Sequence, residues 1–187
     1  NANSIVIHKG AETLEVTRTK LAGGVYPTVH PAQKFKTSLL SAQFVTPLRW
    51  ETASACALLP ALLRRGTVSC PDMGVLSARL DRLYGARIDC TVRKKGENQC
   101  VGFVASLIDD SYAPGGERLL EPVAALLGEL ICDPVTERGR FVSAYFDSEK
   151  ANLIDAIRSI LNDKREYAEG RLLREMCAGE AYGIPRL

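Results

Sequence analysis

The feature that most constrains this fold is an apolar stretch at residues 52–65, which is long enough for a helix. The stretch is apolar on most faces, and a helix of that kind must be buried by other elements on all sides. Pro60 lies inside it, where a proline removes the backbone hydrogen bond to the Cys56 carbonyl and kinks the helix. No side chain from Ala57 to Leu63 can bind a metal, take up a proton or attack a substrate. We therefore predict a buried structural helix at the centre of the domain.

The segments around this helix predict strands and helices that occupy separate parts of the chain. In chain order they are strands at 4–8, 13–20 and 35–45, a helix at 73–84, a hairpin of strands 86–93 and 99–108, and helices at 117–132, 137–162 and 164–177. Asp72 is the expected N-cap of the helix at 73–84. The strand at 99–108 is apolar on both faces, which predicts a central position in the sheet. Helices segregated from an antiparallel sheet indicate an α+β fold, with the helices packed on one face.

Composition and charge argue against two kinds of partner. The chain has 187 residues, with 24 basic and 22 acidic side chains and a net charge of +2. A nucleic-acid-binding domain usually has a strongly basic balance, so no nucleic-acid partner is predicted. No apolar run approaches the roughly 18 residues of a membrane-spanning helix, so no membrane span is predicted either. The length suits one domain with a substantial core, or at most two small ones.

The six cysteines are interpreted as reduced thiols of a cytoplasmic protein. They are Cys56, Cys70, Cys90, Cys100, Cys132 and Cys177, and no two of them form a Cys-x-x-Cys pair. All lie in apolar or strand-like surroundings, and a chain with this much core does not depend on a disulfide framework. No signal peptide opens the sequence. Cys90 and Cys100 could face each other across the predicted hairpin, although proximity alone does not make a bridge.

Motifs for metal-dependent or nucleophilic catalysis are absent from the sequence. The two histidines, His8 and His30, have no second ligand at helical spacing, whereas zinc needs three or four ligands. No Gly-x-Ser-x-Gly turn and no Gly-rich phosphate loop occurs, so neither a metal nor a cofactor is predicted. A Ser-His-Asp triad stays open, because triads assemble in space. Cys56 and Cys90 are the candidates for a cysteine-based enzyme, but neither has a base nearby in the sequence.

Two short segments flank the buried helix in a recognisable order. Trp50-Glu51-Thr52 precedes it and Arg65-Gly66-Thr67 follows it. This order resembles the N-terminal half of the M16 (pitrilysin/insulinase) metallopeptidases, which carry His-x-x-Glu-His on this helix, shortly before a Lys-Gly-Thr exit. The resemblance places the first zinc-binding His at Ala57, the catalytic Glu at Pro60 and the second His at Ala61. All three chemical groups are missing.

Other segments continue the resemblance in the same order along the chain. They are Leu83-Tyr84-Gly85-Ala86 with the following Ile88-Asp89-Cys90-Thr91, then Pro134, Phe146-Asp147-Ser148-Glu149-Lys150, and Tyr182-Gly183-Ile184-Pro185. The third zinc ligand of active members, a Glu, falls at Ala156, with Asp155 one residue away. The whole resembles the branch of inactive M16 subunits that accompany an active one, and residues 83–86 and 162–168 resemble its bacterial members in particular.

The resemblance implies both a fold and a function. The fold is the M16 peptidase or LuxS-like metallohydrolase half-domain, a single unit over residues 1–187 without the C-terminal half. The function is that of a catalytically inactive, cofactor-free partner subunit, which joins a second M16-type subunit as a homo- or hetero-oligomer and encloses a peptide-binding chamber. Proteolysis then comes only from an active zinc peptidase partner, because alanines and a proline supply neither a metal ligand nor a base.

The strand that contains Ile88, Asp89, Cys90 and Thr91 is the expected peptide-binding element. Such a strand could pair with an extended peptide or line the chamber, because main-chain pairing needs no particular side chain. Two alternatives stay open beside this reading of the sequence. One is an enzyme with a spatially assembled cysteine site, and the other is a purely architectural domain.

Overall fold

The computed structural model describes residues 3–9, 12–32 and 34–185. Its contacts divide the chain into two units, residues 1–36 and residues 37–187, and each is described by itself. The prediction of one half-domain over residues 1–187 stays a prediction.

The first unit is a small antiparallel sheet. Its strands β1 (Asn3–Lys9), β2 (Glu12–Arg18) and β3 (Thr28–Val29) pair in the order β1-β2-β3. β1 and β2 correspond to the two strands predicted near the start of the chain. β3 lies in a segment that contains Gly23, Gly24, Pro27 and Pro31, a composition more typical of a loop.

The second unit is built on a three-stranded antiparallel sheet. β4 (Thr37–Pro47), β5 (Arg87–Lys95) and β6 (Asn98–Ile108) pair in the order β4-β6-β5. β6 is therefore central, as its apolar sequence predicts, and β5 forms one edge. The register sets Gln43, Gly102 and Thr91 in one row across the three strands.

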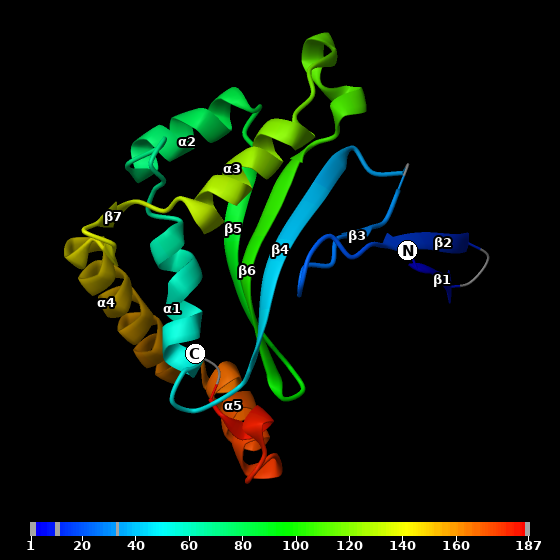
Figure 1. Cartoon of the computed structure of the whole chain (residues 1–187). Helices are drawn as coiled ribbons and strands as arrows, with labels where there is room; N and C mark the ends of the chain where they lie inside the picture. Colours follow the sequence, from blue (N-terminus) through cyan, green and yellow to red (C-terminus); the bar gives the residue numbers. More distant parts are fainter. Residues whose placement is uncertain (1–2, 10–11, 33, 186–187) are drawn as a thin grey trace. The chain divides into compact units, whose positions relative to one another are not determined.

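Five α-helices lie in the described part of this unit. They are α1 (Ala53–Leu63), α2 (Met73–Arg82), α3 (Leu120–Cys132), α4 (Ser143–Ser159) and α5 (Lys164–Met176). α1 and α3 pack on the same face of the sheet, and α4 lies against α1 on the side away from the sheet (Figure 1). The predicted α+β fold, with helices on one face of an antiparallel sheet, is confirmed. Within the described residues, no helix combines the length and the apolar character needed to cross a membrane.

The core of this unit lies between the sheet and α3. Ile88 and Phe103 from the sheet meet Val123, Leu126 and Leu130 from the helix, and none of the five is more than 1% exposed. Full burial of such a side chain stabilises the fold by about 1.5–3 kcal/mol, so this layer holds β5 and β6 in place. α1 is also largely buried, as its sequence predicts, and it continues through Pro60 to Leu63.

The helix predicted over 137–162 starts later than expected. A short hairpin precedes it, in which β7 (Thr136–Glu137) and β8 (Arg140–Phe141) are joined by Arg138 and Gly139. These two turn residues have φ values of 52° and 75°, which suit a tight hairpin turn and are incompatible with a right-handed helix. α4 therefore begins at Ser143, and a 3₁₀ turn, η3 (Ile160–Asn162), extends it to the predicted end.

Cys90 and Cys100 do not face each other, contrary to the sequence-based suggestion. The register of the β5–β6 hairpin places Cys90 opposite Phe103 and Cys100 opposite Arg93. All six cysteines belong to the described residues, and all are free thiols. The loop of Gly96 and Glu97 sets this register, because it joins Lys95 directly to its partner Asn98.

Candidate functional site

The helix positions at which the resemblance expects two zinc ligands and a base lie in the middle of α1. Ala57 and Pro60 are buried there, and Ala61 is half-buried. Ala156, the expected position of the third ligand, is exposed on α4. None of these four side chains has an atom that can coordinate a metal. In the described part of the chain, no group of three or more His, Cys, Asp and Glu residues could hold a metal ion.

An ion pair joins the end of α1 to α4 close to these positions. Arg65 contacts the Glu149 carboxylate, donates to the Ser148 Oγ at 2.8 Å, and lies 5.5 Å from the centroid of the Tyr145 ring. The Arg65 and Glu149 side chains are only 22% and 16% exposed, so the pair is largely shielded from solvent. The Glu149 carboxylate therefore holds α4 against α1.

The Cys90 thiol on β5 lacks the character of a nucleophile. Burial raises the pKa of this thiol to about 11, and the charges of Asp89 and Glu149 add to the rise while Arg64 opposes it. A thiol with such a pKa is protonated near neutral pH, whereas the reactive form of cysteine is the thiolate. Cys56, the other candidate, lies half-buried on α1.

The four residues predicted to bind a peptide lie on an edge strand. β5 pairs with β6 from Arg87 to Lys95, and no described strand pairs with its other side. Ile88 is in the core and Cys90 is half-buried on the same side, whereas Asp89 and Thr91 face the opposite side of the sheet. The four side chains therefore do not converge on one site, and what they share is the main chain of an unpaired edge.

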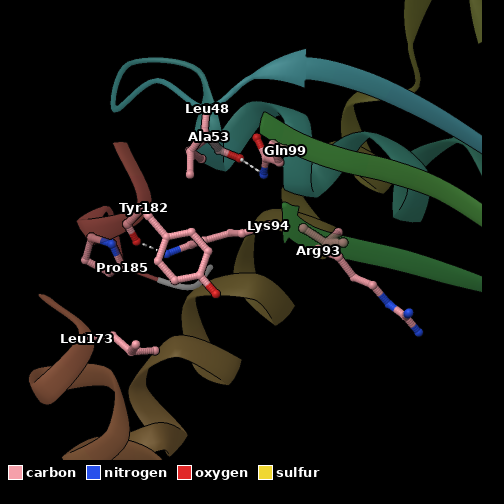
Figure 2. Close-up of a pocket in the computed structure, with 9 residues that line it drawn as sticks. Leu48, Ala53, Arg93, Lys94, Gln99, Leu173, Tyr182 and Pro185 are labelled. Atoms are coloured by element: carbon pink, nitrogen blue, oxygen red, sulfur yellow. Dashed lines mark hydrogen bonds between the residues drawn. The ribbon is translucent and has the colours of Figure 1, made fainter. Parts of the chain in front are cut away.

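A pocket that was not predicted from the sequence lies near the C-terminal end of β5 (Figure 2). Its volume is about 280 Å³, and its walls include Leu48, Ala53, Val92, Gln99, Leu173 and Tyr182. Lys94 Nζ donates to the Tyr182 carbonyl at 3.1 Å and also to the Ile184 carbonyl, which holds the C-terminal segment beside β5. The one feature of the sequence that could have indicated this pocket is Gln99, a polar residue at the start of the apolar strand predicted over residues 99–108.

Comparisons with known proteins agree with this picture. No protein-family model matches the chain. The chain is 35% identical over 162 residues to a Bacillus subtilis (strain 168) protein named "Probable inactive metalloprotease YmfF", a match that covers 87% of this chain and 38% of that protein. The crystal structure of a conserved protein from Enterococcus faecalis has the same fold, with a TM-score of 0.73 and 29% identity. That match covers 84% of this chain and 38% of the other.

These similarities confirm part of what the sequence predicts. The α+β fold is shared with a solved bacterial structure of related sequence. The chain spans 38% of the length of the curated relative, whose name describes a probable inactive metalloprotease. The chain is therefore similar to a metallopeptidase-like protein that is described as inactive.

Proposed function

We propose that the chain is a single M16-like N-terminal half-domain, over residues 1–187, of a catalytically inactive peptidase homologue that binds extended peptides. The proposal rests on two neighbouring features, the substituted positions on α1 and the edge of β5. Ala57, Pro60 and Ala61 occupy the places on α1 where the resemblance expects zinc ligands and a base. The neighbouring strand β5 still offers an edge that no described strand covers. The name of the Bacillus relative supports the loss of catalysis.

The side chains in this region supply no route to peptide hydrolysis. Metal-assisted hydrolysis requires ligands for the ion and a base for the attacking water, and alanine and proline provide neither. The protonated Cys90 thiol weighs against the alternative of a cysteine enzyme. We therefore propose that any proteolysis comes from an active zinc peptidase subunit that assembles with this protein.

β5 would bind a peptide by adding it to the sheet as a further strand. The main-chain N–H and C=O groups on the unpaired edge would form the ladder, and the peptide side chains would alternate between the two sides of the sheet. Arg87, Arg93 and Lys95 are exposed along this strand. Their positive charge favours peptides with acidic residues, and this preference should weaken as salt is added.

Assembly with a second M16-type subunit, in a homo- or hetero-oligomer in the cytoplasm and without a cofactor, is the other part of the proposal. Leu161, Leu172 and Met176 are 67%, 58% and 70% exposed, and all three belong to the C-terminal helical segments. Leu172 and Met176 lie four residues apart on α5 and so share one helix face, and exposed apolar side chains on one face favour an interface. Together with the second subunit, the β5 edge would then line a peptide-binding chamber.

Two measurements on the full-length protein test the loss of catalysis. Elemental analysis should find no stoichiometric zinc, and a peptidase assay should find no hydrolysis that a chelator abolishes. Bound zinc together with chelator-sensitive cleavage by the protein alone would contradict the proposal. A pull-down from the native cells should recover a zinc-bearing homologue, and the recovered complex should cleave peptides.

A binding assay separates peptide binding at β5 from a purely architectural role. A labelled extended peptide is N-methylated on alternate residues, so that its N–H groups on one edge are removed. Of the two possible sets of N-methyl groups, the one facing β5 should weaken binding to the full-length protein at least about tenfold relative to the other. Equal affinities of the two N-methylated peptides, or no binding of the parent peptide, would favour the architectural role.

A further inference from the structure

Charged side chains follow one another on the outer face of β5, the side that is turned away from α1 and α3. Ile88 packs with α3 in the core, so the odd-numbered residues of the strand lie on the outer face. The charged ones are Arg87, Asp89, Arg93 and Lys95, and all four are exposed. Figure 2 shows Arg93 directed away from Lys94, its neighbour on the inner side. The outer face is therefore positive at Arg93 and Lys95 and negative at Asp89.

The fold leaves these charges without a counter-ion of their own. Among the residues that the structure describes, no side chain forms a hydrogen bond or an ion pair with any of the four. Cross-strand pairs of opposite charge stabilise a sheet, and like charges directly opposite each other destabilise it. A strand added at this edge is therefore selected by the charges that it places opposite Arg93 and Asp89.

The hairpin turn determines which residues of β5 can bind such a strand through the main chain. Lys95 and Asn98 close a two-residue turn, and the closing pair of such a turn exchanges main-chain hydrogen bonds. These bonded pairs recur at every second residue, so Arg93 and Asp89 direct their main-chain groups to β6, and their neighbours direct theirs to the free edge. In an antiparallel ladder, side chains lie closest at the positions that do not exchange hydrogen bonds, with Cα atoms about 4.5 Å apart. Residues of an added strand opposite Arg93 and Asp89 would occupy such positions.

A second pocket lies on the outer face at the positive end of β5. Its volume is about 410 Å³. Arg93 and Lys95 line it together with Gln43 of β4 and Asn98 of β6, whereas Asp89 does not line it. The other lining side chains are apolar or carry a hydroxyl group. An acidic side chain suits this space, because a carboxylate forms its strongest hydrogen bonds with cationic donors such as these two.

We infer that β5 takes an extended peptide as an antiparallel strand in one register, with an acidic residue opposite Arg93 and a basic residue opposite Asp89. Antiparallel pairing is the more stable of the two directions, and complementary charges fix the register. Because the two positions are four residues apart, the peptide carries Glu or Asp four residues before Lys or Arg. The peptide itself rests on the proposed function, and the order of its charges rests on the outer face of β5.

Two labelled peptides of identical composition test this order. In one, Glu stands four residues before Lys, and in the other the two residues are exchanged. Their net charges are equal, so a general attraction to the basic residues of β5 does not distinguish them. We expect the Glu-first peptide to bind the full-length protein about fivefold more tightly at low salt, as measured by fluorescence anisotropy. Equal affinities of the two peptides, or tighter binding of the Lys-first peptide, would overturn the inference.

Exchange of the two charges on β5 tests the location. Asp89→Arg combined with Arg93→Glu keeps the net charge, and both residues are exposed, so no core contact is removed. This variant should reverse the preference and bind the Lys-first peptide more tightly. The matched control is Arg165→Glu combined with Glu169→Arg on α5, an exposed pair at the same spacing, and it should leave the preference unchanged. A preference that the β5 exchange does not reverse would overturn the assignment.

N-methylated forms of the two peptides separate this inference from the proposed function. If N-methyl groups facing β5 weaken both peptides and the parent peptides bind equally, the charge order is overturned and the proposed function stands. If neither parent peptide binds, the proposed function and the inference both fail. A preference for the Glu-first peptide that N-methylation leaves unaffected would overturn pairing at the β5 edge.

Discussion

Gln43 on β4 reaches across the middle strand of the sheet and exchanges hydrogen bonds with Thr91 on β5. Gln43 Nε2 donates to Thr91 Oγ1 at 2.8 Å, and Thr91 Oγ1 donates to Gln43 Oε1 at 3.1 Å. Gly102 of β6 lies between them in the register, and the missing side chain leaves the path open. A glycine in the central strand therefore lets the two outer strands contact each other directly.

Substitution of this glycine should destabilise the fold. In Gly102→Ala the added Cβ would lie 2.1 Å from the Ala42 carbonyl oxygen, at a φ of +155° that L-residues rarely adopt. We expect the free energy of unfolding in urea to fall by about 1–3 kcal/mol. Gly128→Ala on α3 is the control, since its Cβ meets nothing within 4 Å and alanine favours a helix by about 0.5–1 kcal/mol. Similar losses in both variants would show that the close approach at Gly102 is not the cause.

The ion pair between α2 and α3 should make stability depend on acid pH. Arg79 donates to both Glu129 carboxylate oxygens, at 2.8 and 2.9 Å, and Ser69 also donates to Glu129. The hydrogen bond from Arg79, followed by that from Ser69, holds the pKa of Glu129 below its ordinary value of 4.5. A carboxyl with a lowered folded-state pKa contributes its full stability above the unfolded pKa and loses it as the pH falls through the folded pKa.

Arg79→Met removes this ion pair and should lower the free energy of unfolding by about 1 kcal/mol near neutral pH, because the pair is partly exposed. Part of the stability loss below about pH 4.5 should disappear in the variant, as measured by urea unfolding along a pH series. Arg165→Met is the control, since its pair with Glu169 is mostly exposed and should change stability little. An unchanged acid profile in Arg79→Met would contradict the role of the pair.

The Cys90 thiol should react slowly with iodoacetamide. Its pKa of about 11 leaves little thiolate near pH 8, so alkylation should accelerate as the pH rises toward 11. Cys132 is exposed and provides an internal comparison in the same protein. Mass spectrometry of the digested protein should find Cys132 modified well before Cys90 at pH 8. Faster modification of Cys90 would instead support the cysteine-enzyme alternative.

Loss of the Lys94 ammonium should release the C-terminal segment from β5. Lys94→Met removes the donors to the Tyr182 and Ile184 carbonyls. Hydrogen bonds from a charged donor are worth about 1.5–3 kcal/mol, so amide exchange at Gly183 and Ile184 should become at least about tenfold faster. Lys95→Met is the matched control on the other side of the strand, and should leave both amides unchanged. Equal acceleration by the two variants would contradict this role of Lys94.

The sequence by itself determined the features that depend on short-range patterns. Apolar residues on both faces identified β6 as the central strand, and an apolar stretch identified α1 as buried. Asp72 caps α2 as predicted, and its carboxylate accepts from the Val75 N–H at 2.9 Å. The lack of any metal ligand or base at Ala57, Pro60 and Ala61 is likewise a property of the residue types. These conclusions needed only the period of the pattern and the chemistry of each side chain.

Only the tertiary structure decided the register, the turn at Arg138–Gly139 and the pocket. A hairpin turn with two positive φ values interrupts a segment whose apolar spacing is still helical, so periodicity missed it. The pairing of Cys90 with Phe103 depends on which two residues form the turn. An odd shift in register would exchange the two faces of β6, but β6 is apolar on both faces, so its pattern does not fix the register. The contacts between Gln43 and Thr91, and between Lys94 and Tyr182, join residues 48 and 88 positions apart. Such contacts are fixed by packing of the whole chain, which leaves no local signature in the sequence.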